Sequence, residues 1–239
     1  MVLTAVETFL RDWPFLTALI VLGVSGVLAG PSVLAATVGA RRLSRTERET
    51  LAHYGVPVDG VRVVARPEGV PTAFAVGVVP GHRYVYVTER LVEVLTPAEL
   101  AGVVAHELGH LRRYHVFPRL GLPTLFVVTW AAAVSADVGG AFLGGLLLVA
   151  PVTLASFATS RWSEYDADAY VTRHADGVAL ADALDRLGQA GYLRRDDVGL
   201  RRLLARHPTL GERVGRLRGS AQTVRTETES DTTVVESDD

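Results

Sequence analysis

The stretch LAGVVAHELGHLRRY, residues 100–114, contains the pattern HExxH. The pattern consists of His106, Glu107 and His110. Residues four apart lie on one face of an α-helix, about 40° from alignment, so both imidazoles can bind one metal ion while the glutamate lies beside them. At this spacing a helix binds zinc and the glutamate serves as a general base. Chance occurrence is the alternative, so the predicted zinc site needs a third ligand elsewhere in the chain.

The residues around this stretch favour an α-helix that begins at Pro97. Thr96 offers a capping hydroxyl, Pro97 suits the first helical position, and Glu99 can reach back to the N-cap. Pro118 marks the expected far end. The apolar residues at helical spacing are Leu100, Val103, Val104, Leu108 and Leu111. They predict one buried face, which leaves the histidine face towards a cleft.

Composition limits both the kind of metal site and the kind of partner. The 239 residues include no cysteine, so a metal must be held by nitrogen and oxygen ligands. One zinc ion per chain is expected. All 24 basic residues are arginine, and the net charge of -2 gives no reason to expect nucleic acid as a partner. With 49% hydrophobic residues, the chain is long enough for one domain plus membrane segments.

Residues 13–40 are expected to form a transmembrane helix. These 28 residues carry no charge, and they exceed the ~20 residues that a helix needs to cross a bilayer. A cleaved signal peptide fits less well, because the apolar run is about twice the usual length and the basic residues follow it.

A helix and three short strands are predicted between this segment and the HExxH helix. Ser44 and Glu47 form a possible capping box for the helix. Residues 61–66, 72–79 and 83–88 are β-branched and aromatic runs separated by turns, as in a small antiparallel sheet. The last run, RYVYVT, leads towards the HExxH helix. It is therefore the expected edge strand beside the site.

Two apolar stretches after the motif predict a helical hairpin in the membrane over residues 120–160. The first stretch has 17 residues, at the lower limit for a span, and Asp137 follows it at the turn. A shallow hairpin, or one buried in a protein core, is the alternative. Arginines near the segment ends gather on the HExxH side, which favours a multi-pass protein of the cell membrane with its catalytic part facing the cytoplasm. A single preceding span then puts the N-terminus outside.

The third ligand is predicted in the helical stretch RWSEYDADAYVTRH, residues 161–174. Glu164 and Asp168 are four apart and share one helix face. Glu164 can complete a His2Glu zinc site, while Asp168 accepts a hydrogen bond from the free nitrogen of a ligating histidine. An ordinary acidic helix face is the alternative. His115, five residues after His110, is expected to point away from the ligand face, as a surface or supporting residue.

These motifs resemble those of the membrane zinc peptidases that include the heat-shock protease HtpX and the CAAX prenyl endopeptidase. HELGH at residues 106–110 is followed, after a hydrophobic hairpin, by the pattern Arg161-x-x-Glu164-x-x-Ala167-Asp168. TAFA at 72–75 is similar to the family's Asn-Ala-Phe-Ala segment, with threonine for asparagine, and HPTLGERVGRL at 207–217 resembles its C-terminal His-Pro motif. The resemblance covers residues 45–218, and the compact size fits HtpX better than the prenyl protease.

The resemblance implies a mainly helical α+β catalytic domain of the gluzincin type, with a small antiparallel sheet and transmembrane helices. It implies a zinc-dependent endopeptidase of membrane protein quality control, whose partners are polypeptide substrates, among them membrane proteins, and the lipid bilayer. Glu107 would take a proton from the attacking water. His207 and Arg213 are the candidates for stabilising the developing oxyanion, and a surface turn with Arg213 paired to an acid is the alternative. One departure is that HtpX-type chains begin with two hydrophobic segments, whereas this chain has one.

The predicted order along the chain has five parts. They are a transmembrane helix (13–40), a first catalytic part (44–119), a membrane hairpin (120–160), a second catalytic part (161–218) and a disordered acidic tail (219–239). Two other functions remain open. A catalytically inactive membrane scaffold or holdase would have no need of Glu107. An intramembrane site-2 type zinc protease would place HExxH inside a spanning helix, yet Arg112 and Arg113 follow the motif at once.

Overall fold

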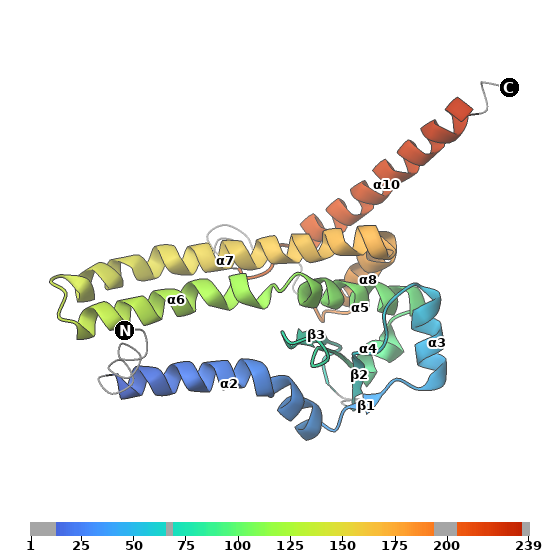
Figure 1. Ribbon diagram of the computed structural model, residues 1–239. Coiled ribbons are helices and arrows are strands. Elements are labelled where there is room, and N and C mark those ends of the chain that lie inside the picture. The colour runs from blue at the N-terminus through green and yellow to red at the C-terminus, as the bar shows by residue number, and fades with distance from the viewer. Residues whose placement is uncertain (1–12, 66–68, 194–204, 236–239) are drawn as a thin grey trace.

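The computed structural model describes residues 13–65, 69–193 and 205–235, and most of them are helical. The elements in chain order are α2 (Pro14–Thr37), β1 (Arg41–Arg42), α3 (Arg45–His53), β2 (Val61–Val64), β3 (Ala73–Val76), β4 (Tyr84–Thr88), α4 (Glu89–Val94), α5 (Pro97–Arg112), α6 (Val116–Ser135), α7 (Ala141–His174), α8 (Gly177–Gln189) and α10 (Leu210–Val235). The sheet, α3, α4, α5 and α8 form one compact part, from which α2, α6 and α7 extend towards the same side (Figure 1). The prediction of a mainly helical α+β domain with a small sheet and long apolar helices is confirmed.

The small sheet is mixed, whereas the sequence predicts a wholly antiparallel one. Its strand order is β1-β2-β4-β3. β1 and β3 each pair antiparallel with a neighbour, but β2 and β4 run parallel, with Val63 opposite Val87. The parallel pairing arises because β3 folds back on the outer side of β4. β1 is a further strand, and its two arginines carry no apolar pattern that would have marked it.

β4, which contains most of RYVYVT, lies inside the sheet, so its prediction as the edge strand is wrong. Val85, Tyr86 and Val87 are all at most 1% exposed. Because successive residues of β4 are buried, both faces of the sheet are covered there, and β4 lies between β2 and β3. The outer strand is β3, which packs beside α5. The site therefore borders β3.

Both predicted capping boxes are present and start their helices where expected. At the start of α3, the Ser44 hydroxyl accepts from the Glu47 amide, and the Glu47 carboxylate accepts from the Ser44 amide. Thr96 and Glu99 exchange the same two bonds at the start of α5. These bonds satisfy amides that have no partner within the helix.

The HExxH helix α5 ends at Arg112, earlier than the boundary predicted at Pro118. Tyr114 adopts a φ of 55°, which breaks the helix. Pro118 lies instead in the first turn of α6, where its missing N–H removes no helical hydrogen bond. A sharp corner therefore separates the HExxH helix from the hairpin.

α6 and α7 form the apolar hairpin predicted after the motif. They have 20 and 34 residues, and within the described residues they are the helices long and apolar enough to cross a membrane. Every residue of α6 is at least partly exposed, and most buried residues of α7 lie from Ser160 onwards. Such a large apolar surface argues against a hairpin in a protein core. α7 then continues unbroken through residues 161–174, so the second catalytic part is rigidly joined to the hairpin.

α2 is a helix of 24 residues within the predicted segment 13–40. Its C-terminal half contacts the sheet region. The Tyr86 hydroxyl lies 3.5 Å from the Pro31 carbonyl oxygen, and the Ser32 hydroxyl lies 3.3 Å from Nδ1 of His82. The membrane crossing of α2 stays a prediction.

Two glycines allow α5 to pack closely against its neighbours. A Cβ at Gly102 would lie 2.9 Å from the backbone nitrogen of Leu180 in α8. A Cβ at Gly109 would lie 3.1 Å from the Cβ of Tyr170 and 3.3 Å from the Cα of Ala167, both in α7. The histidine face of α5 is thereby brought against the acidic face of α7.

α10 extends from Leu210 to Val235, whereas the sequence predicts a disordered tail from residue 219. Residues 236–239 lie outside the described residues. The first turns of α10 are anchored because Val214 and Leu217 are buried in the core. Extending an existing helix costs far less than starting one, which accounts for the continuation.

Candidate metal centre

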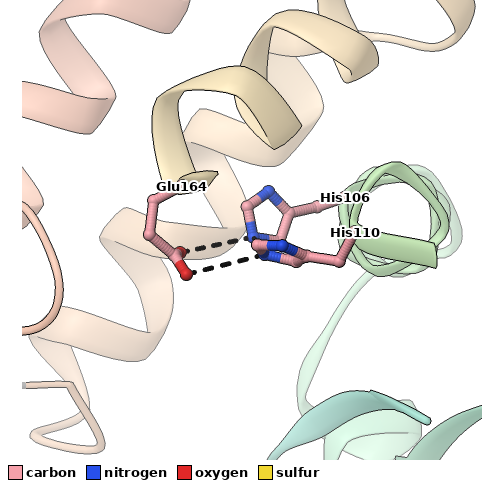
Figure 2. Close-up of side chains that lie close together, drawn as sticks. All are labelled: His106, His110 and Glu164. Carbon is pink, nitrogen blue, oxygen red and sulfur yellow. Dashed lines mark hydrogen bonds and ion pairs between the residues drawn. The ribbon is translucent and has the colours of Figure 1, made fainter. Parts of the chain in front are cut away.

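The three predicted ligands lie together between α5 and α7 (Figure 2). His106 and His110 project from α5, and Glu164 projects from α7. One ligand atom from each residue lies within 4.8 Å of the others. The two Nε2 atoms are 3.2 Å apart, and each lies 3.5 Å from a different oxygen of Glu164. Two imidazole nitrogens and one carboxylate converging on one point form a donor set that fits zinc and leaves a fourth position open.

Glu107 lies beside the ligands on α5 and lines the same cavity. Its side chain is half-buried, and burial raises the pKa of its carboxyl. A carboxylate with a raised pKa can take up and return a proton closer to neutral pH. Its position and pKa therefore suit a general base.

A carboxylate and an arginine hold the other nitrogen of His106. Nδ1 of His106 lies 3.0 Å from Asp168. Arg213 donates to both oxygens of Asp168, over 2.9 and 2.7 Å, and lies 3.3 Å from Glu164. Asp168 thus occupies its predicted place beside a ligating histidine. The pairing of Arg213 with an acid agrees with the alternative to an oxyanion role, in which Arg213 forms an ion pair.

The other nitrogen of His110 faces His115, contrary to the prediction that His115 points away. The two Nδ1 atoms are 2.8 Å apart, and Nε2 of His115 lies 2.9 Å from Asp166. Arg113 donates to the second oxygen of Asp166. His115 leaves the helical phase of α5 because of the positive φ of Tyr114. No motif in the sequence marks Asp166.

The two candidate histidine ligands differ in their affinity for a proton. Burial and the charge of Arg213 oppose protonation of His106, but its contacts with Asp168 and Glu164 outweigh them and raise its pKa to about 9. Burial and the charge of His106 lower the pKa of His110 to about 3. Both nitrogens must be unprotonated to bind a metal ion, so metal binding would compete with protonation of His106. Burial also lowers the pKa of His115 despite its bond to Asp166.

Two further side chains approach Glu164 from other elements. Nδ1 of His207 lies 3.3 Å from its Oε1, and the His207 side chain is 62% exposed. Arg119 of α6, which no motif marks, lies 3.7 Å from the same oxygen. Thr209 and Glu212 form a capping box at the start of α10, with bonds of 3.3 Å. This capped helix start holds His207 at the centre.

A cavity of about 1500 Å³ contains these groups and continues between the apolar helices. Its polar end is lined by the candidate ligands, Glu107 and β3. Its apolar end includes Val27 of α2, Phe126 and Trp130 of α6 and Phe157 of α7. Polar groups with catalytic potential thus lie at one end of an otherwise apolar cavity.

Comparison with known proteins identifies relatives among the peptidases. The model of peptidase family M48 matches residues 39–221. A protease HtpX homologue of Tropheryma whipplei is 32% identical over 225 residues, which cover 75% of each chain. A protease HtpX homologue of Salinibacter ruber is 28% identical, over 84% of this chain and 86% of its own.

A solved structure shares the fold. The crystal structure of S. mikatae Ste24p superposes with a TM-score of 0.67 at 19% sequence identity. The match covers 86% of this chain and 58% of that protein.

Proposed function

The chain belongs to peptidase family M48, a family of metallopeptidases, and we propose that it is a zinc-dependent membrane endopeptidase that degrades damaged or misassembled membrane proteins. The observation that carries this proposal is the convergence of His106, His110 and Glu164, with Glu107 beside them. The similarity to proteases named HtpX supports the reaction class and the membrane location.

The residues of the centre have distinct proposed parts in peptide-bond hydrolysis. Zinc, when bound by His106, His110 and Glu164, supplies a Lewis acid and a water of lowered pKa. Glu107 takes a proton from the attacking water and passes it to the leaving amine. Asp168 keeps the ring of His106 in the orientation that presents Nε2.

His207 and Arg213 are proposed to face the carbonyl oxygen on which negative charge develops. The two differ in their freedom to move. His207 is 62% exposed and can turn towards a substrate. Arg213 is 11% exposed and bonded to both oxygens of Asp168. We therefore assign the direct contact with substrate to His207, while Arg213 adds positive charge nearby and supports Asp168.

An extended substrate would pair with β3. This strand ends the described sheet, is partly exposed and lines the cavity. Main-chain hydrogen bonds to an edge strand hold a polypeptide with little sequence selectivity. β3 replaces RYVYVT in this role, because β4 lies inside the sheet. Low selectivity suits the removal of varied damaged proteins.

The apolar end of the cavity supports membrane proteins as the substrate class. An apolar segment of a substrate would lie between α2, α6 and α7 while the adjoining chain reaches Glu107. Spans at residues 13–40 and 120–160 would hold the two catalytic parts, residues 44–119 and 161–218, at the membrane. The arginine bias then places these parts in the cytoplasm.

Zinc content and cleavage, measured on the same preparations, test the proposal. The wild type should hold one zinc ion and cleave casein or a detergent-solubilised membrane protein. Glu107→Gln should keep zinc and lose turnover, whereas Glu164→Ala should lose both. Glu93→Gln is a matched control, since Glu93 is exposed and forms an ion pair with Arg90 of the same helix, α4. It should change neither quantity.

The outcome also separates the alternative functions. Zinc binding without Glu107-dependent cleavage would favour a scaffold or holdase. Full zinc content and activity in Glu164→Ala would refute the third ligand. An intramembrane protease of the site-2 type is disfavoured, because α5 packs in the domain core and is distinct from the membrane-length helices α6 and α7.

A further inference from the structure

We propose that His115 and Asp166 position the zinc ligand His110 and thereby set the zinc affinity of the centre. The inference rests on the proposed function, because it concerns the same metal site. His115 is a positioning residue in this account, since it acts on the metal only through the ring of His110.

The contacts run in one line from the ligand atom to Arg113. Nε2 of His110 faces Glu164 at 3.5 Å, while Nδ1 of the same ring lies 2.8 Å from Nδ1 of His115. Nε2 of His115 then lies 2.9 Å from Asp166, and Arg113 holds Asp166 through its other oxygen. Both contacts of His115 lie within the usual range for hydrogen bonds.

These contacts decide which nitrogen of each ring carries the hydrogen. A ligating nitrogen must offer its lone pair, so Nε2 of His110 is bare and Nδ1 carries the hydrogen. His110 donates that hydrogen to Nδ1 of His115. The hydrogen of His115 is then on Nε2, which donates to Asp166. Every donor in the line meets an acceptor, and the line ends on a carboxylate.

Burial holds His115 in this orientation. The residue is 1% exposed, and its ring packs edge-on against His110 and Trp162, with centroid separations of 4.9 and 5.7 Å. A buried polar group without a hydrogen-bond partner destabilises the folded protein. Turning the ring of His115 away from either partner would have this effect. The ring of His110 is therefore fixed from behind.

The other histidine ligand has a shorter support of the same kind. His106 meets Asp168 directly, and Arg213 holds Asp168. In both cases the second ring nitrogen leads to an α7 carboxylate that an arginine holds. For His110, the ring of His115 fills the longer distance to α7. The two supports share no residue, so their effects on zinc affinity should be independent.

Zinc affinity, measured by competition with a chelator, tests the inference. His115→Phe keeps a ring in place but removes both hydrogen-bonding nitrogens, and it should weaken zinc binding about 10- to 100-fold. The amide of His115→Gln can accept from His110 and donate to Asp166, so this variant should recover most of the loss. His174→Phe is a matched control, since His174 stacks on Tyr170 elsewhere on α7. It should leave the affinity unchanged.

Double variants separate one line of contacts from a general loosening of the site. His115→Phe combined with Asp166→Asn should be little worse than His115→Phe alone, because both changes break the same line. His115→Phe combined with Asp168→Asn should lose affinity additively, as expected for independent supports.

The melting temperature of the metal-free protein is the second readout, because a loss of packing would lower it. We expect only a small decrease in His115→Phe, because His110 and Asp166 lose a buried hydrogen-bond partner, and its recovery in His115→Gln. Unchanged zinc affinity in that variant would overturn the inference. So would a loss of affinity that is matched by lower metal-free stability and is not recovered in His115→Gln. A wild-type protein that binds no zinc would instead refute the proposed function.

Discussion

Replacing Gly109 by alanine should weaken zinc binding, because the new methyl group would push α5 and α7 apart. The added Cβ would lie 3.1 Å from the Cβ of Tyr170 and 3.3 Å from the Cα of Ala167, a few tenths of an ångström inside ordinary van der Waals contact. Metal–ligand distances tolerate deviations of only about 0.2 Å. A shift of α7 large enough to relieve the clash would therefore displace Glu164 from the two histidines of α5.

The size of the effect follows from two opposing terms at Gly109. Alanine favours a helix over glycine by about 1 kcal/mol. Overpacking a close contact costs about 1–3 kcal/mol. The net loss of unfolding free energy should be about 0–2 kcal/mol. Strain of that size on the metal-bound form would raise the zinc dissociation constant about 10-fold, which corresponds to about 1.4 kcal/mol.

Chelator competition and thermal unfolding of the metal-free protein measure the two quantities. Gly215→Ala is the matched control, because Gly215 is exposed in α10 and an added Cβ would meet nothing within 4 Å. That variant should gain up to about 1 kcal/mol and keep its zinc affinity. A Gly109→Ala protein with wild-type zinc affinity would show that the helices yield without displacing Glu164, and would refute the reasoning.

Three further predictions concern the support of His106, the oxyanion partner and the topology. Asp168→Asn should weaken zinc binding about 10- to 100-fold in chelator competition, because the second nitrogen of His106 loses its carboxylate; an unchanged affinity would contradict this role. His207→Ala should lower kcat about 100-fold and keep zinc, as loss of one oxyanion donor does. Arg213→Ala should lower zinc content as well, because Asp168 loses its partner, and unchanged kcat in both variants would leave neither residue as the oxyanion partner. A reporter fused at the N-terminus should be extracytoplasmic and one after residue 239 cytoplasmic, whereas both reporters on one side would mean a different number of membrane crossings.

Features that depend on residues close in sequence could be predicted without the structure. Thr96 and Glu99 are three apart, and that spacing alone satisfies two free amides at the start of α5. His106 and His110 share a helix face for an equally local reason. Glu164 could be singled out because Asp168 follows one turn later and both acids lie on the face of α7 that meets α5.

The order of the strands depends on contacts between distant segments, and there the prediction failed. RYVYVT is expected at the edge because it leads towards the HExxH helix, but its place in the chain does not decide which strands pair with it. In the sheet, Tyr86 and Thr88 are buried, as are Val85 and Val87. β2 pairs with one edge of β4, and β3, which precedes β4 in the chain, folds back to pair with the other edge. The substrate-binding edge passes to β3 for that reason.

The direction of His115 was predicted wrongly because it depends on a corner of the backbone. On a continuous helix, His115 would lie about 140° around the axis from His110, facing away from the metal. Tyr114 instead takes a left-handed φ of 55° and ends α5, which turns His115 back beneath the ring of His110. Residue spacing can therefore identify which histidines could bind a metal ion. The orientation of the His110 ring also depends on His115, whose position depends on where α5 ends. Because α5 ends at Arg112, His115 lies within hydrogen-bond distance of both His110 and Asp166.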